Sequence, residues 1–95
     1  MNKYTKSAKG QECQIRIPFV CNRNSETTVL AHLNGGGMGI KHLDIHATYA
    51  CSACHDAVDG RLKVLSATRQ ELKGMHLEGV IRTQVLMVQS GVLKL

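Results

Sequence analysis

Aromatic residues are almost absent from this chain, which has no tryptophan, one phenylalanine and two tyrosines among its 95 residues. The core must therefore be built from aliphatic side chains and alanine, which bury less area per residue than aromatic rings do. A chain of this length also buries a smaller fraction of its surface than a larger domain does. We therefore expect one small domain whose core needs support from a metal or from disulfides.

Long apolar runs are also missing, which argues against a membrane-spanning helix. The most hydrophobic segment lies near the C-terminus, where Arg82, Gln84, Gln89 and Ser90 interrupt it well short of the roughly 20 apolar residues that span a bilayer. The basic N-terminus is not followed by the apolar stretch of a secretory signal. We expect no membrane partner and a cytoplasmic chain, in which cysteines bind metals more often than they form disulfides.

Charge is distributed unevenly along the chain, whose formal net charge is +5. Residues 1–23 carry five Lys or Arg against one acid, and residues 61–95 carry six against two. Residues 24–60 carry one Lys against four acids and are rich in histidine. Basic flanks suit a phosphate backbone, and an acidic, histidine-containing centre suits a divalent cation. The alternative is that the lysines merely solvate a small domain.

The first third of the chain favours extended structure. Residues 1–11 have no apolar period, so we expect a flexible basic arm ahead of a single domain over residues 12–95. Polar and apolar residues alternate over residues 13–18, which favours a short edge strand or an extended segment. Residues 27–32 are β-branched and apolar, and they predict a strand that ends near its histidine.

Two helices are predicted after a loop at residues 34–39, where four of six residues are glycine. Residues 46–58 are rich in alanine, and a stretch with this composition favours a helix. Residues 68–71 read Thr-Arg-Gln-Glu, the pattern of a capping box, and predict a long helix over about residues 69–90. Its apolar stripe is expected to face the core, with a homodimer through this helix as the alternative. The stripe is centred on Leu77, Ile81, Val85 and Val88 and is widened by Leu72, Val80 and Met87.

The four cysteines have spacings that indicate one zinc site. Cys51 and Cys54 are separated by two residues, the gap that lets two thiolates at the start of a helix bind one tetrahedral ion. Cys13 and Cys21 are separated by seven residues and could converge on that pair from an extended segment. The alternative is that these two are ordinary buried thiols. We predict a structural Zn²⁺ held by all four, because it would supply the cohesion that the core lacks.

Residues 51–55, Cys-Ser-Ala-Cys-His, also match the attachment motif of c-type haem. Such attachment is typical of exported chains with an apolar pocket, and a haem would leave Cys13 and Cys21 without a role. A redox dithiol is a further alternative, but it would be expected within a βαβ frame that the sequence does not show. Zinc therefore remains the favoured interpretation.

A strand histidine, a glycine loop and the Cys-Ser-Ala-Cys-His segment together resemble the ββα-metal core of HNH (His-Me finger) endonucleases. The run from Cys21 to Arg61 is similar to the small prophage-encoded YbcO-like nucleases, above all at residues 27–32 (Thr-Thr-Val-Leu-Ala-His) and 50–61 (Ala-Cys-Ser-Ala-Cys-His-Asp-Ala-Val-Asp-Gly-Arg). The resemblance implies an α+β fold in which a zinc-stapled ββα-metal core, over about residues 13–61, precedes the long C-terminal helix. It also implies a divalent-metal-dependent endonuclease that cleaves DNA in the cytoplasm of a bacterial host.

Phosphodiester hydrolysis needs a base that activates water and a cation that neutralises charge on the phosphate. Histidine ordinarily titrates near neutral pH, so His32 is predicted to be the base. The resemblance implies that His55 binds the catalytic ion, Mg²⁺ or another divalent metal. Asp59, one helical turn further on, or Asp44 would be its second ligand. His46 would orient the base or support the loop.

Two departures from the HNH pattern keep other interpretations open. Ala31 stands where these enzymes commonly have a metal-binding Asp or His, and the central letter of the motif matches Asn34, Asp44 or His46. The predicted base could instead be a buried structural histidine, and Asp59 could pair with a nearby basic residue. The alternative function is therefore a non-catalytic zinc module that binds DNA or a recombination partner.

Lysines and arginines on both flanks are predicted to contact the phosphate backbone of DNA. No base-reading helix or set of stacking aromatics is evident, so we expect recognition of shape or backbone. Duplex, branched and single-stranded DNA all remain open, as does RNA. His42 and His76 receive no role. The predicted phosphate contacts are Lys9, Arg16, Arg23, Lys41, Arg61 and Lys63.

Overall fold

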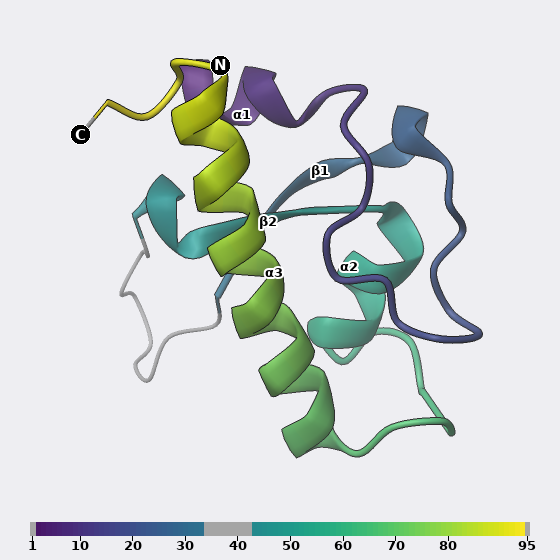
Figure 1. Cartoon of the computed structure of the whole chain (residues 1–95). Helices are drawn as coiled ribbons and strands as arrows, with labels where there is room; N and C mark the ends of the chain where they lie inside the picture. The colour runs from purple at the N-terminus through teal and green to yellow at the C-terminus, as the bar shows by residue number, and fades with distance from the viewer. Residues whose placement is uncertain (1, 34–42, 95) are drawn as a thin grey trace.

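A two-stranded antiparallel sheet lies at the centre of the fold, and a long helix crosses it (Figure 1). The computed structural model describes residues 2–33 and 43–94, so the predicted glycine loop, Lys41 and His42 lie outside the described residues. Short 3-10 turns, η1 and η2, precede the two strands, and the order of elements confirms the predicted α+β class. The elements are α1 (Lys3–Ala8), η1 (Ser25–Thr27), β1 (Val29–His32), η2 (Asp44–His46), β2 (Ala47–Ala50), α2 (Ser52–Val58) and α3 (Arg69–Gln89).

Strand β2 occupies part of the segment for which a helix was predicted, so that prediction is wrong over residues 47–50. β2 pairs antiparallel with β1, and His32 lies opposite Ala47. All four residues of β2 are buried between β1 and α3. The alanine content favoured a helix, but strand pairing and burial outweigh so weak a propensity. The helix begins only at Ser52.

The N-terminal segment, predicted to be a flexible arm, contains a helix. The side-chain oxygen of Asn2 accepts a hydrogen bond from the backbone N–H of Thr5 at 2.9 Å and so caps α1. Ala8 is 1% exposed, and Tyr4 packs against the same cluster of buried side chains. The four-residue spacing of Tyr4 and Ala8 was a signal for this helix in the sequence. One apolar pair, however, is too short a pattern to predict a helix.

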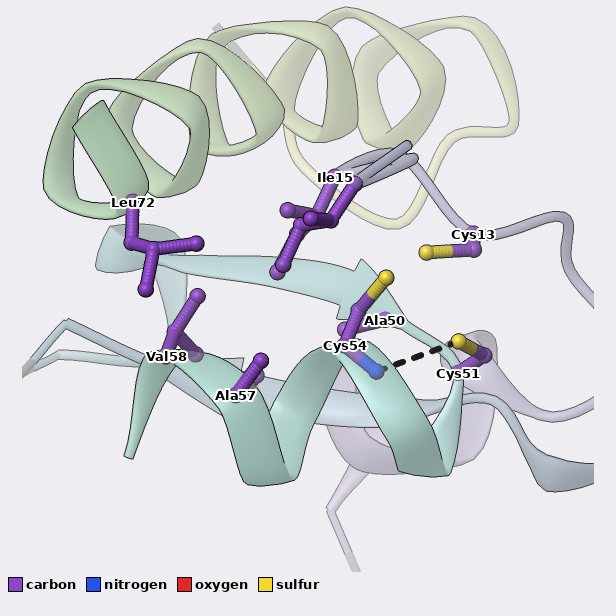
Figure 2. Packing of buried hydrophobic residues seen from close by; sticks show 10 residues of the cluster. Cys13, Ile15, Ala50, Cys51, Cys54, Ala57, Val58 and Leu72 are labelled. Carbon is purple, nitrogen blue, oxygen red and sulfur yellow. Dashed lines mark hydrogen bonds between the residues drawn. The ribbon is translucent and has the colours of Figure 1, made fainter. Parts of the chain in front are cut away.

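Buried side chains form two clusters that use opposite faces of the sheet. One contains Leu30 and Tyr49. The other contains Ala31 and Ala50, Leu72 of α3, several residues of α2, and three of the four cysteines (Figure 2). Neighbouring residues of a strand point to opposite faces, so each strand contributes to both clusters. The cysteines therefore continue the core on one face of the sheet.

Helix α3 is the predicted long helix, but of its apolar stripe it buries only the residues that were predicted to widen the stripe and not the centre. Its capping box is confirmed: the Thr68 side chain accepts from the N–H of Glu71, and the Glu71 carboxylate accepts from the N–H of Thr68. The centre of the stripe is exposed, by 51% at Leu77, 63% at Ile81, 52% at Val85 and 36% at Val88, whereas the three residues predicted to widen it are buried. Hydrophobicity misled the prediction because the true buried face is partly polar. It consists of Leu72, His76, Gly79, Val80, Thr83 and Met87.

Gly79 allows α3 to pack directly on the sheet. A Cβ atom placed there would lie 2.6 Å from Oγ1 of Thr48 and 3.3 Å from the carbonyl oxygen of Gln14. Thr48 is buried, and its hydroxyl oxygen lies 3.2 Å from that of Thr83, so it cannot shift without breaking a buried hydrogen bond. We expect Gly79→Ala to lower the free energy of unfolding by about 1–3 kcal/mol, the usual cost of overpacking, although alanine is the better helix former.

Gly74→Ala, on the same helix, is the matched control for this prediction. A Cβ atom at Gly74 would meet nothing within 4 Å. Alanine should therefore raise the free energy of unfolding there by about 0.5–1 kcal/mol through helix propensity alone. Urea unfolding of both variants beside the unmodified protein measures the two signs. If the two variants proved equally stable, α3 would not pack on Thr48 as described.

Candidate functional site

The four cysteines converge, as their spacing predicted. Their sulfur atoms all lie within 4.8 Å of one another. Cys51 caps the N-terminus of α2, Cys54 lies in its first turn, and Cys13 faces them from the segment that precedes β1 (Figure 2). Cys21 comes from the same segment as Cys13. Cys21 is half-buried and the other three are buried. Attachment of a haem to Cys51 and Cys54 would leave Cys13 and Cys21 without a role, and both belong to this cluster.

Hydrogen bonding and burial make these sulfurs unequal as acids. A hydrogen bond with the Cys54 thiol lowers the pKa of Cys13 to about 4, and the same bond, with burial, raises the pKa of Cys54. Burial also raises the pKa of Cys21, whose sulfur lies 3.9 Å from that of Cys51. One thiolate is thus favoured, whereas several at this separation repel one another. A tetrahedral Zn²⁺ binds four thiolates at once, so the donor set fits zinc.

The segment that carries Cys13 and Cys21 is shaped by turns, and it does not form the predicted edge strand. The backbone N–H of Cys21 donates to the carbonyl oxygen of Ile17 at 2.9 Å. Residues other than glycine rarely adopt a left-handed backbone, and each that does so costs on the order of 1 kcal/mol or more. These turns bring Cys21 back toward Cys13. The left-handed residues are Arg16 (φ 55°), Phe19 (φ 65°) and Arg23 (φ 55°).

His32 lies at the end of β1, where its ring contacts η2. Its Nε2 atom is 2.7 Å from Oδ1 of Asp44. The other carboxylate oxygen of Asp44 accepts a hydrogen bond from the side-chain amide of Asn2 at 2.6 Å. The His32 side chain is 40% exposed, so it is not the sealed structural histidine that was the alternative. Water can therefore reach this ring.

The contact with Asp44 gives the imidazole ring of His32 a defined tautomer. An ionised carboxylate only accepts hydrogen bonds, and the bond with His32 is the main cause that lowers the pKa of Asp44. Asp44 is therefore ionised at neutral pH, so in the neutral form of the His32 ring Nε2 carries the proton and Nδ1 keeps the lone pair. A histidine held in this way by a carboxylate is suited to act as a general base.

His55 and Asp59 face each other on α2, as their spacing of four residues predicted. Nε2 of His55 lies 3.1 Å from Oδ2 of Asp59. The Arg61 guanidinium lies 3.1 Å from the same oxygen and 3.0 Å from Oδ1 of Asp56. The sequence left open whether Asp59 lies beside His55 or pairs with a basic residue, and in the structure it contacts both His55 and Arg61. Within residues 2–33 and 43–94, only the cysteines form a group of three or more potential metal ligands close enough to share an ion.

His76, which received no role from the sequence, lies beneath the strand that carries His32. It is 4% exposed, and its Nε2–H donates to the carbonyl oxygen of Ala31 at 2.9 Å. Burial lowers the pKa of His76, so the ring is neutral at pH 7. This bond ties the end of β1 to α3 and so fixes the backbone next to His32. In the sequence, only its spacing of four residues from Leu72 indicated that His76 lies on the buried face of α3. The more hydrophobic stripe on the other side of the helix obscured this pattern.

Five of the six predicted phosphate contacts are described by the structure, and all five are exposed. Arg16 and Arg23 line a groove of about 350 Å³ beside the cysteine cluster. Arg61 is paired with two acids, as described above. No helix in the described part of the chain is long and apolar enough to cross a membrane. The exposed set consists of Lys9, Arg16, Arg23, Arg61 and Lys63.

Comparison with known proteins identifies close relatives over nearly the whole chain. The family profile described as "Putative nuclease YbcO" matches residues 2–92. Two proteins of that name, from Escherichia coli (strain K12) and from Enterobacteria phage 82, are each 50% identical over 92 residues, which is 94% of this chain and 94% of theirs. A solved structure described as a "putative bacteriophage protein" from Escherichia coli K-12 is 48% identical, with a TM-score of 0.79 over 93% of this chain and 99% of that one.

Proposed function

This chain belongs to the YbcO family of phage-associated nucleases, and from that membership we propose that it is an HNH-type, divalent-metal-dependent endonuclease that hydrolyses phosphodiester bonds in DNA. The observation that carries the proposal is the pair formed by His32 and Asp44, 2.7 Å apart at the end of β1. β1, β2 and α2 follow in the order of a ββα-metal core, here over about residues 13–61. His55 on α2 is a histidine on the helix of this core, where HNH endonucleases have a ligand of the catalytic ion.

His32 is the proposed general base. Nδ1 takes a proton from water as the water oxygen attacks phosphorus, and the bond from phosphorus to the leaving oxygen then breaks. Asp44 stabilises the imidazolium that forms, because its carboxylate already accepts the hydrogen bond from Nε2. The leaving oxygen takes its proton from solvent. His46, at the end of η2, is the proposed support for the loop beside this base.

His55 and Asp59 are the proposed ligands of the catalytic ion. When bound, a divalent ion such as Mg²⁺ neutralises charge on the scissile phosphate and on the leaving oxygen. If Asp59 held that ion, its contact with Arg61 would weaken, and Arg61, which also contacts Asp56, would be freer to bind a phosphate. Asp44 is the other candidate ligand, although its contact with His32 favours the orienting role. The four cysteines are the proposed ligands of a separate, structural Zn²⁺.

The exposed lysines and arginines are proposed to contact the phosphate backbone of DNA. They suit recognition of backbone or shape, because phosphate contacts carry no sequence information directly. The exposed apolar face of α3, centred on Ile81, is the proposed contact of a homodimer, for which the mass in solution is the measurement. The DNA contact is inferred from the exposure and charge of the basic side chains, and the homodimer contact from the exposure of the apolar ones.

Cleavage of supercoiled plasmid and branched DNA by zinc-loaded protein tests the proposed function. We expect nicked or shortened products with Mg²⁺ or Mn²⁺ and none when the added ion is omitted. Omission is preferable to a chelator, because a chelator would also remove zinc from the cysteines. The zinc content, measured on the same samples, is the control. Salt-sensitive DNA binding without cleavage of any substrate would instead favour the non-catalytic zinc module.

A further inference from the structure

Phe19, the one phenylalanine of the chain, is fully exposed at the turn between Cys13 and Cys21. Its side chain is 100% exposed, and its backbone is left-handed, with φ at 65°. An exposed ring gains nothing from burial, and a left-handed backbone position suits glycine or asparagine better than a bulky residue. Neither core packing nor local backbone geometry therefore accounts for a phenylalanine here.

Basic side chains line the same hollows as the exposed ring. Phe19 lines the groove of about 350 Å³ together with Arg16, Arg23 and one acid, Glu12. It also lines a neighbouring hollow in which Lys63 is the charged residue. Three cations and one acid thus line the two hollows that this aromatic ring borders. This combination is complementary to a nucleobase with a phosphate on each side.

The turn that presents Phe19 is held on both sides. Cys13 and Cys21 belong to the sulfur cluster. The Ser66 hydroxyl donates to the carbonyl oxygen of Pro18 at 3.2 Å, which ties the turn to the segment between α2 and α3. Ile17 is buried next to the turn. A ring on a fixed support loses little conformational freedom when it binds a ligand.

We propose that Phe19 is a stacking platform for an unpaired nucleobase, with Arg16 and Arg23 contacting the phosphates on either side. Every base has a flat aromatic face, so such stacking tolerates any sequence. In duplex DNA those faces lie inside the stack, and a ring on a protein surface reaches one only where a strand is single, frayed or branched. The proposal rests on nucleic acid being the substrate of the proposed function. It names the substrate class as DNA with unpaired nucleotides.

The cysteine cluster connects this platform to the candidate active site. Cys21 lies two residues beyond Phe19, and Cys54 directly precedes His55. The ion that fixes the turn would therefore also fix the helix that carries the proposed metal ligand. An unpaired nucleotide held on Phe19 would be positioned relative to α2 by that shared support.

Fluorescence anisotropy with labelled DNA, without added Mg²⁺ so that cleavage does not interfere, tests the proposal. The probes are a single strand, a forked duplex and a blunt duplex. We expect Phe19→Ala to weaken binding to the single strand and the fork by about 5- to 100-fold, and to leave duplex affinity unchanged. Phe19→Tyr should retain the affinity. Val29→Ala, which shortens an exposed apolar side chain of β1, is the matched control and should change none of the three affinities.

A fork whose single-stranded arm carries only abasic sites isolates the stacking. The unmodified protein and the Phe19→Ala variant should bind this fork equally, because its single-stranded arm has no base that could stack on the ring. Equal binding of the two proteins to the intact fork would overturn the proposal even if the protein cleaves plasmid. Selective loss of duplex binding would also overturn it, because the ring would then act as a wedge between base pairs. Phe19-dependent binding to the fork without any cleavage would uphold the platform and reject the nuclease.

Discussion

Replacement of His32 by alanine is expected to lower the rate of DNA cleavage by about 10²- to 10⁴-fold, the usual contribution of a general base. The variant keeps Asp44, the cysteines and the exposed basic residues, so DNA binding and zinc content should not change. The measurement is the rate of plasmid nicking in saturating Mg²⁺. Circular dichroism and zinc content show whether the variant is folded. Added imidazole should restore part of the rate, because it can supply the missing base from solution.

Asp44→Asn separates the two roles that are open to this carboxylate. If Asp44 orients His32, the amide can donate a hydrogen bond to Nε2, which favours the tautomer with its proton on Nδ1 and removes the base. Cleavage should then fall at every Mg²⁺ concentration. If Asp44 instead binds the ion, a higher Mg²⁺ concentration should restore the rate. Unchanged cleavage by His32→Ala, with folding intact, would remove His32 from the mechanism altogether.

Removal of zinc is expected to unfold the protein. Structural zinc sites bind with an apparent free energy of about 10–16 kcal/mol, which is as large as the whole stability of a typical domain. The cysteines belong to a core cluster in which alanines contribute much of the burial. We therefore expect Cys54→Ala, or a chelator added to the unmodified protein, to abolish the cooperative unfolding transition. Circular dichroism follows the transition, and added Zn²⁺ should restore it after chelation.

Ser52→Ala is the matched control, because it changes an exposed side chain between two of the cysteines. Its hydroxyl accepts a hydrogen bond from the Asn22 amide at 3.1 Å on the surface, so its loss should cost no more than about 1 kcal/mol. The experiment needs a reducing agent, since a disulfide could otherwise replace the ion. Equal stability of reduced protein with and without chelator would show that the cysteines are ordinary buried thiols.

Local patterns predicted the parts of the fold that depend on neighbours in the sequence. The gap between Cys51 and Cys54, and the run from Thr68 to Glu71, each fix geometry within one helical turn. The four-residue spacing of His55 and Asp59 does so as well. These predictions are matched by the sulfur cluster, the capping box and the contact on α2.

Tertiary contacts decided the features that the sequence did not reveal. Strand β2 looked helical by composition and became a strand because β1 and α3 bury it. The buried face of α3 could not be recognised from hydrophobicity, since Gly79 and Thr83 are buried for close packing against Thr48. Asp44 was a candidate for several roles, and only the fold places it beside His32. Such pairings depend on which surfaces meet, and no short window of sequence records this.

The hydrogen bond from Asn2 to Asp44 has a practical consequence for the preparation of the protein. Asn2 caps α1 and contacts the carboxylate that holds the proposed base, so the first turn of α1 lies against the candidate active site. An affinity tag or fusion partner at the N-terminus would be attached at that point and would compete for the same space. An inactive preparation with an N-terminal tag would therefore be no test of His32.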